Sequence, residues 1–94
     1  MKQMSQQTAR IVRELHDEPH IEGSRITVRY IYGRVHEHGL RPETVAERHN
    51  LDIADVYRAL AYYHENPDEM DQVEARHERA VEVAREASMT PPDA

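Results

Sequence analysis

The sequence predicts a mainly α-helical fold: a tri-helical unit with a helix-turn-helix, a minimal β-hairpin before it, and further N-terminal and long C-terminal helices. Gly39, Pro42 and Asp52 stand where one helix would end and two others would begin. The turn between the last two helices, Asn50-Leu51, is short, as in a helix-turn-helix. Between these breaks, apolar residues recur at helical spacing, which supports the same interpretation.

The composition predicts one small domain with a thin core. The chain has 94 residues, five of them Tyr and none of them Trp or Phe, so the core must be built from Ile, Val, Leu, Met, Ala and those tyrosines. A thin core of this kind makes a homodimer a reasonable expectation. The absence of Cys excludes a disulfide scaffold, a thiolate nucleophile and cysteine-ligated zinc.

No segment of the sequence predicts membrane insertion or export. No apolar run approaches the roughly 18 residues that a membrane span requires. The first ten residues also lack the apolar centre of a signal peptide. We therefore expect a soluble, cytoplasmic protein without a membrane partner.

The net charge of −6 is concentrated near the C-terminus. Residues 64–94 carry nine acidic side chains and three arginines, whereas acids and bases balance in residues 1–63. The basic residues of the chain are eleven Arg and one Lys, a bias compatible with a GC-rich and salt-loving host. The acidity therefore has two open explanations, a halophilic host or a basic partner.

The N-terminal part predicts a short helix followed by a hairpin. Residues 6–15 carry apolar side chains on one helical face, with Ser5 available as N-cap. Pro19 then favours an extended chain. Two short strands, His20-Ile21 and Arg25 to Thr27, are expected around a turn at Gly23, where glycine permits a positive φ.

Three helices are then expected in close succession. Thr27 is expected to cap the first, which ends at His38-Gly39 and buries Val28, Ile31, Tyr32 and Val35. The second runs from Pro42 to about His49, buries Val45 and Ala46, and is followed by Leu51 in the turn. Asp52 is expected to cap the third, whose buried positions would be Ile53, Val56, Leu60 and Tyr63.

A long acidic helix is predicted from Pro67 to about Ser88. Asn66 as N-cap, Pro67 at the first position and Glu69 at the third form the pattern of a capping box. One side is a seam of mostly small residues, defined here as Met70, Val73, His77, Ala80, Ala84 and Ala87. The resulting division is residues 1–18 (helix and linker), 19–66 (hairpin and helix-turn-helix), 67–89 (acidic helix) and 90–94 (disordered tail).

The segment that begins the hairpin resembles the domain-of-unknown-function 433 family. The family signature is represented by Pro19, Ile21, Gly23, Ser24, Arg25, Ile26 and Val28, and the similarity extends over about residues 16–75. The chain departs from the family in having Asp17-Glu18 where relatives often have Gly-Gly, and Arg41 at the cap of the second helix. The resemblance implies a homeodomain-like tri-helical fold.

The same resemblance implies a function. Many members of the family are VapB-type antitoxins encoded beside a PIN-like ribonuclease toxin. The expected function is therefore that of the antitoxin in a toxin–antitoxin system, which neutralises such a toxin and could also repress its own operon. The alternative is a helix-turn-helix DNA-binding transcription regulator without a toxin partner.

DNA binding would depend on the third helix and nearby arginines. Its outward residues are expected to be Ala54, Asp55, Arg58, Tyr62 and Glu65, of which Arg58 is the best reader of bases. Phosphate contacts could come from Arg25, Arg29, Arg34, Arg41 and Arg48. The candidate operator-DNA residues are thus Arg58, Arg48, Arg41, Arg29 and Tyr62. The alternative is that most of the arginines are ordinary surface charges and that Arg25 braces the hairpin.

Protein binding would depend on the acidic helix. Four glutamates stack at i,i+4 on one side of it: Glu74, Glu78, Glu82 and Glu86. Such a row is most often a solvated face, and the alternative is a strip that binds a basic partner. The seam on the other side could pack against the first helix or a second subunit.

The residues predict neither a metal site nor catalysis. His36 and His38 would point in different directions on a helix, and His16 and His20 lack further ligands at typical spacing. The three glycines form no phosphate-binding loop, and the three serines show no nucleophile motif. We therefore expect no cofactor, no metal and no enzyme activity.

Overall fold

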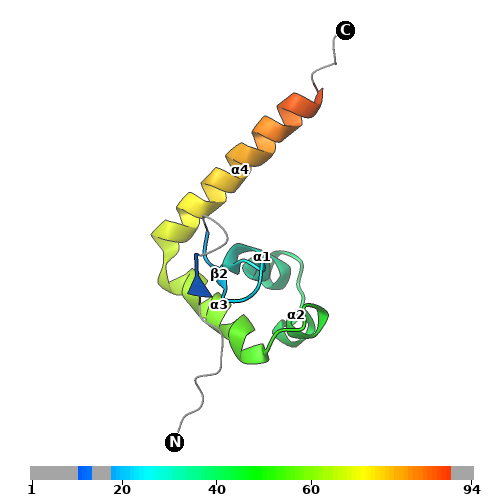
Figure 1. The fold of residues 1–94 in the computed structure, drawn as a ribbon, viewed down its shortest axis with the longest axis vertical. Coiled ribbons are helices and arrows are strands. Elements are labelled where there is room, and N and C mark those ends of the chain that lie inside the picture. The colour runs from blue at the N-terminus through cyan, green and yellow to red at the C-terminus, as the bar shows by residue number, and fades with distance from the viewer. Residues whose placement is uncertain (1–10, 14–17, 90–94) are drawn as a thin grey trace, which may run out of the picture.

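The computed structural model describes residues 11–13 and 18–89, which are mainly helical, as predicted. Two strands, β1 (Ile11–Val12) and β2 (His20–Ile21), come first. The helices follow in the order α1 (Val28–Tyr32), η2 (Gly33–Glu37), α2 (Pro42–Arg48), α3 (Ile53–Glu65) and α4 (Pro67–Met89). Figure 1 shows the strands and α1 to α3 gathered into one body, from which α4 extends as a long rod.

Ile11 and Val12 form a strand, so the helix predicted over residues 6–15 is wrong at these positions. β1 pairs antiparallel with β2, with Ile11 opposite Ile21 and Val12 opposite His20. Adjacent β-branched residues lose side-chain freedom in a helix and fit a strand better. The other residues of the predicted helix, 6–10 and 14–15, lie outside the described residues.

The minimal β element is confirmed, but the predicted strand His20-Ile21 (β2) pairs with β1 and not with residues 25–27. The predicted strand from Arg25 to Thr27 is reduced to a single bridge between His20 and Thr27. Gly23 has the positive φ expected of it, +80°, and the turn closes with a 3.0 Å hydrogen bond from the Ile21 amide to the Ile26 carbonyl. The turn thus forms as predicted, while the longer pairing is made with a segment nearer the N-terminus.

The first helix of the body is regular only in its first half. Thr27 caps α1 as predicted, and its Oγ1 accepts a 3.0 Å hydrogen bond from the Tyr30 amide. The chain then widens into the π-helix η2, in which the His38 amide donates to the Gly33 carbonyl at 3.1 Å. Gly39, with φ of +71°, ends the helical segment as predicted.

A four-residue connection, 49–52, joins α2 to α3. Asn50 adopts a left-handed conformation with φ of 54°, which asparagine tolerates better than most residues. The Leu51 amide then donates to the Ala46 carbonyl at 2.8 Å, so the turn is tied to the end of α2. Pro42 is the first residue of α2 as predicted, and the Arg41 side chain provides no cap.

The buried face of α3 is rotated from the predicted one. Ala59 is fully buried beside Val56, whereas Ile53 is 39% exposed because the first residue of the helix lies beyond the packed region. The same rotation buries Asp55, which was expected to point outward and is only 5% exposed. Asp52 occupies the N-cap position, but its side chain makes no capping hydrogen bond, so that prediction is wrong.

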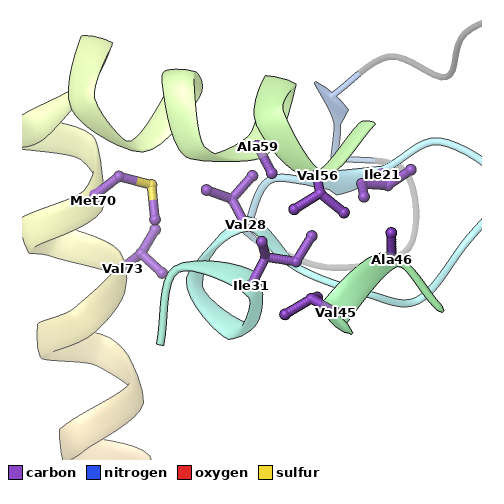
Figure 2. Packing of buried hydrophobic residues seen from close by; sticks show 9 residues of the cluster. All are labelled: Ile21, Val28, Ile31, Val45, Ala46, Val56, Ala59, Met70 and Val73. Carbon is purple, nitrogen blue, oxygen red and sulfur yellow. The ribbon is translucent and has the colours of Figure 1, made fainter. Parts of the chain in front are cut away.

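The core is a cluster of nine aliphatic and methionine side chains centred on α1 (Figure 2). Val28 and Ile31 of α1 are both fully buried and lie in the middle of the cluster. Met70 and Val73 of α4 close one end, and Val45 and Ala46 of α2 lie toward the other. The remaining members are Ile21, Val56 and Ala59. The core therefore joins β2 and all four α-helices.

The predicted capping box at the start of α4 is wrong, although Pro67 is the first helical residue as predicted. The backbone amide and the side-chain Nδ2 of Asn66 both donate to the Tyr62 carbonyl, each at 3.0 Å. The Glu69 carboxylate accepts hydrogen bonds from Arg13 and Tyr62. These bonds tie the start of α4 to α3 and β1, where the capping box would have tied it to Asn66.

Across the part of the chain that the structure describes, no helix combines the length and the apolar character that crossing a membrane would require.

Two valines allow a matched test of the core. Val56→Ala should lower the free energy of unfolding by about 2 kcal/mol, since Val56 is fully buried and its loss leaves a cavity. Val83→Ala should change it by less than about 0.5 kcal/mol, because Val83 on α4 is 65% exposed. Urea unfolding followed by circular dichroism measures both. Equal losses would show that Val83 is buried in solution.

Candidate partner-binding surfaces

Only the first part of α4 contributes to the body. Met70 and Val73 are 1% and 2% exposed, and every residue from 78 to 88 is exposed. At about 1.5 Å per residue, these eleven exposed residues extend roughly 16 Å along the helix. The exposed part is called the α4 rod below and comprises residues 78–88. Figure 1 shows this part of α4 standing clear of the body.

The α4 rod carries three glutamates in a row on one side, two arginines, Arg79 and Arg85, beside that row, and small or apolar residues elsewhere. Glu78, Glu82 and Glu86 of the predicted row are exposed, and Glu74 is half-buried beside the body. The Glu82 Oε1 accepts a 2.8 Å hydrogen bond from Arg85, an exposed i,i+3 pair of small energetic value. The predicted row of glutamates therefore forms a continuous line that leaves the body.

The seam divides into a buried and an exposed half. Met70 and Val73 belong to the core, His77 is half-buried, and Ala80, Ala84 and Ala87 are exposed. Val81 is 39% exposed beside them. Among the described residues, nothing covers the second half of the seam. It offers a narrow surface to which another helix could approach closely.

A hydrogen-bonded triad fixes α4 relative to the body. The Tyr62 hydroxyl donates to Glu69 at 2.6 Å, and Arg13 donates to both the Tyr62 hydroxyl, at 2.7 Å, and the Glu69 carboxylate. Tyr62 belongs to α3, Glu69 belongs to α4, and Arg13 directly follows β1. Tyr62, one of the candidate DNA residues, is thus engaged in the joint between α3 and α4.

The triad shifts the pKa values of all three members, and the hydrogen bond to Glu69 raises the pKa of Arg13. Burial and the hydrogen bond to Glu69 raise the pKa of Tyr62. Burial by itself would raise the pKa of Glu69, but the hydrogen bonds from Arg13 and Tyr62 and the Arg13 charge outweigh it, so that pKa is lowered. Glu69 is therefore held as a carboxylate.

The candidate DNA residues do not form one surface on α3. Arg58 donates to the buried Asp55 at 2.9 Å, and its side chain is 40% exposed. Arg41 and Arg48 are exposed at opposite ends of α2, and Arg29 of α1 lies 3.4 Å from Glu18. Arg58 and Tyr62 thus have partners within the chain, and Arg41, 78% exposed, lies 3.8 Å from Glu43, while Arg48 is exposed. The outer side of α3 carries the partly exposed Ile53 and Tyr57.

No group of three or more metal-ligating side chains comes together within residues 11–13 and 18–89. His36 stacks on Tyr32 with ring centroids 4.3 Å apart, and Tyr32 stacks in turn on Tyr63 at 3.5 Å. His16 lies outside the described residues. The histidines of η2 and α3 thus take part in an aromatic cluster that joins those two helices.

A family model described as "Protein of unknown function (DUF433)" matches residues 13–63, which is 51 of the 94 residues. The chain belongs to the DUF433 family. No curated protein and no solved structure matches the chain. The DUF433 match ends near the end of α3, whereas the similarity was expected to reach about residue 75. The acidic α4 therefore lies outside the matched region.

Most of the DUF433 signature serves the fold. Pro19, Ile21 and Val28 are fully or almost fully buried, and Ile26 packs against the core. The other members shape the turn: Gly23 supplies the positive φ, and the Ser24 hydroxyl accepts a 3.0 Å hydrogen bond from the Ile26 amide. Arg25 alone of the signature has a charged and exposed side chain. It lines a hollow with Arg29, Tyr30 and His49, a grouping that sequence spacing did not predict.

The lowered pKa of Glu69 predicts acid sensitivity of the joint. The folded-state pKa lies below the ordinary value of 4.5, so the unfolded chain binds this proton at a higher pH than the folded protein does. The triad therefore contributes its full stability above that value and loses it as the pH falls through the folded-state pKa. Glu69→Gln should lower the free energy of unfolding by about 1 kcal/mol at about pH 6 and by less at about pH 3.

Urea unfolding at the two pH values measures this difference. Glu47→Gln on α2 is the control, because Glu47 is exposed. It should leave the free energy of unfolding nearly unchanged at both values. A Glu69→Gln deficit of the same size at both pH values would contradict the role assigned to the carboxylate.

Proposed function

We propose that the protein is the antitoxin of a toxin–antitoxin system and that its α4 rod binds and neutralises a PIN-like ribonuclease toxin. The observation that carries the proposal is the exposure of residues 78–88, the end of the acidic helix α4, which present a row of three glutamates without a covering partner among the described residues. The nature of the toxin is taken from the family resemblance. The surface chemistry below supports the mode of binding.

Charge favours this partner class. Helix α4 contains seven acidic side chains and three arginines. A ribonuclease must attract the RNA polyanion, so its substrate groove is expected to be basic. An acidic helix would be drawn to such a groove and would occupy the place of the substrate. Binding of a helix in a groove is also a common mode of peptide recognition.

The seam supports a second contact, between two copies of the chain. Its exposed half contains Ala80, Ala84 and Ala87, whose small side chains allow close approach of two helices. We propose that the homodimer expected from the thin core pairs along this half. The glutamate row lies on another side of the helix, so dimer formation and toxin binding are compatible.

A second candidate is a DNA-binding regulator, and it rests on the α2–α3 connection. The four-residue connection with the left-handed Asn50 supports a homeodomain-like helix-turn-helix of α1, α2 and α3. In this proposal Arg48 and Arg41 contact phosphates, and the protein represses its own operon or another one. The internal pairing of Arg58 with Asp55 makes specific base reading by α3 weaker than the sequence indicates.

Charge reversal on the α4 rod tests the antitoxin proposal. Glu78→Lys with Glu82→Lys should weaken binding to a PIN-like ribonuclease toxin by at least about tenfold, because both changes repel a basic groove. Isothermal titration calorimetry of the purified proteins measures the affinity. In the host, the same variant should fail to rescue growth when the toxin is expressed.

The control variant carries the same charge change on the body. Glu43 and Glu47 are also exposed and also stand four residues apart on a helix. Glu43→Lys with Glu47→Lys should retain most of the affinity.

Truncation after residue 76 gives an independent test, since it removes the rod and keeps Met70 and Val73 in the core. Full toxin binding by the truncated chain would sink the proposal.

The DNA candidate has its own test. Arg48→Ala should weaken operator and random duplex DNA alike and lessen the salt dependence by about one phosphate contact. Arg58→Ala should relax sequence preference and also lower stability, because it leaves the buried Asp55 without its 2.9 Å partner. Fluorescence anisotropy at several salt concentrations measures both. Unaltered DNA binding by the two variants would remove this surface from consideration.

A further inference from the structure

A hollow of about 310 Å³ lies between the start of α1 and the end of α2. Its volume is at the lower end of the range for small-molecule sites, which is roughly 300 to 1,000 Å³. The lining residues are Arg25, Ile26, Thr27, Arg29, Tyr30 and His49. They belong to the turn, to α1 and to the residue that ends α2, so the fold brings together groups that lie far apart in the sequence.

The hollow is cationic. Arg25 and Arg29 both line it, and none of its lining residues is acidic. Glu18 lies 3.4 Å from the Nε atom of Arg29 and engages that side of the guanidinium. A guanidinium has five N–H donors, and this ion pair at Nε involves at most one of them. Two arginines in one hollow are suited to a phosphate, which accepts paired hydrogen bonds from a guanidinium.

Tyr30 supplies an aromatic wall that is already held in position. Its ring is 37% exposed, and its hydroxyl lies 3.3 Å from the His49 Nε2. The Arg34 guanidinium lies over the ring, 5.6 Å from its centre, and the His49 ring meets it edge-on at 5.2 Å. Ile26 adds an apolar side chain to the lining. The hollow therefore combines anion-binding groups with a fixed aromatic and apolar surface.

We propose that this hollow binds one nucleotide, either free or within a single-stranded nucleic acid. The phosphate contacts Arg25 and Arg29, and the base or ribose lies against Tyr30 and Ile26. Aromatic stacking beside cationic groups is the usual chemistry by which proteins hold single-stranded nucleic acids. An inorganic anion would use the arginines and leave Tyr30 unused. The inference stands independently of toxin binding, because it concerns the body and not the α4 rod.

The test is an NMR titration of the full chain with four probes: adenosine monophosphate, adenosine, inorganic phosphate and a single-stranded pentaadenylate. Adenosine monophosphate or pentaadenylate should shift the amide signals of Arg25, Arg29, Tyr30 and His49. Adenosine and inorganic phosphate should each bind at least about tenfold more weakly, since each lacks one half of the ligand. Saturation by the mononucleotide identifies free nucleotide as the source, and saturation by pentaadenylate alone identifies nucleic acid.

Matched variants locate the site. Arg25→Gln should weaken binding at least about tenfold, and Arg79→Gln, an exposed arginine of α4, should not. Tyr30→Leu should weaken it at least about fivefold, and Tyr57→Leu, a half-exposed tyrosine of α3, should not. Equal losses in variant and control would overturn the inference, and so would equal affinity for inorganic phosphate. Tighter binding of a peptide of residues 67–89 at the same amides would overturn it in favour of contact between copies.

Discussion

Burial of α1 is the constraint on which the rest of the structure depends. Val28 and Ile31 are fully buried, and the side chains around them come from β2, α2, α3 and α4. With neither Trp nor Phe in the chain, no single large side chain can fill the centre. Close packing must instead come from contacts among many smaller side chains, and each contact depends on the direction in which its helix runs. Residues that set where a helix begins or ends therefore matter for the packing. Examples are Thr27 at the start of α1, Gly39 after η2 and Asn50 between α2 and α3.

The same constraint gives α4 two roles along its length. Met70 and Val73 close the core, so the first two turns of α4 cannot be removed without exposing it. Beyond His77 the helix has left the body, and its direction is set at the joint by the Arg13, Tyr62 and Glu69 triad. A surface that is held rigidly outside the body loses less conformational entropy on binding than a flexible tail would. The α4 rod is therefore preorganised for a partner, and its stability is coupled to that of α3.

Helix ends were predictable from the sequence because their signals are local. Pro42, Pro67, Gly39 and the turn at Gly23 all lie where the sequence indicated. Contacts between distant segments were not predictable: β1 pairs with β2, and Glu69 binds Tyr62 and Arg13 where a capping box was expected. The candidate surfaces differ in the same way: one rests on a local pattern and the other on contacts between distant segments. The glutamate row on α4 could be read from i,i+4 spacing, whereas the hollow joins Arg25 to His49 across 24 positions, and no local pattern indicates that.

The two proposed surfaces have opposite charge, and this difference has a consequence for how they combine. The α4 rod carries three glutamates and two arginines, whereas the hollow between α1 and α2 is lined by two arginines and no acidic residue and would attract a polyanion. A partner ribonuclease with a basic groove would meet the rod first, because charge steers the encounter. A nucleic acid would instead be attracted to the cationic hollow on the body. The two surfaces are therefore suited to partners of opposite charge, and the volume of the hollow suits a small ligand such as the single nucleotide proposed for it.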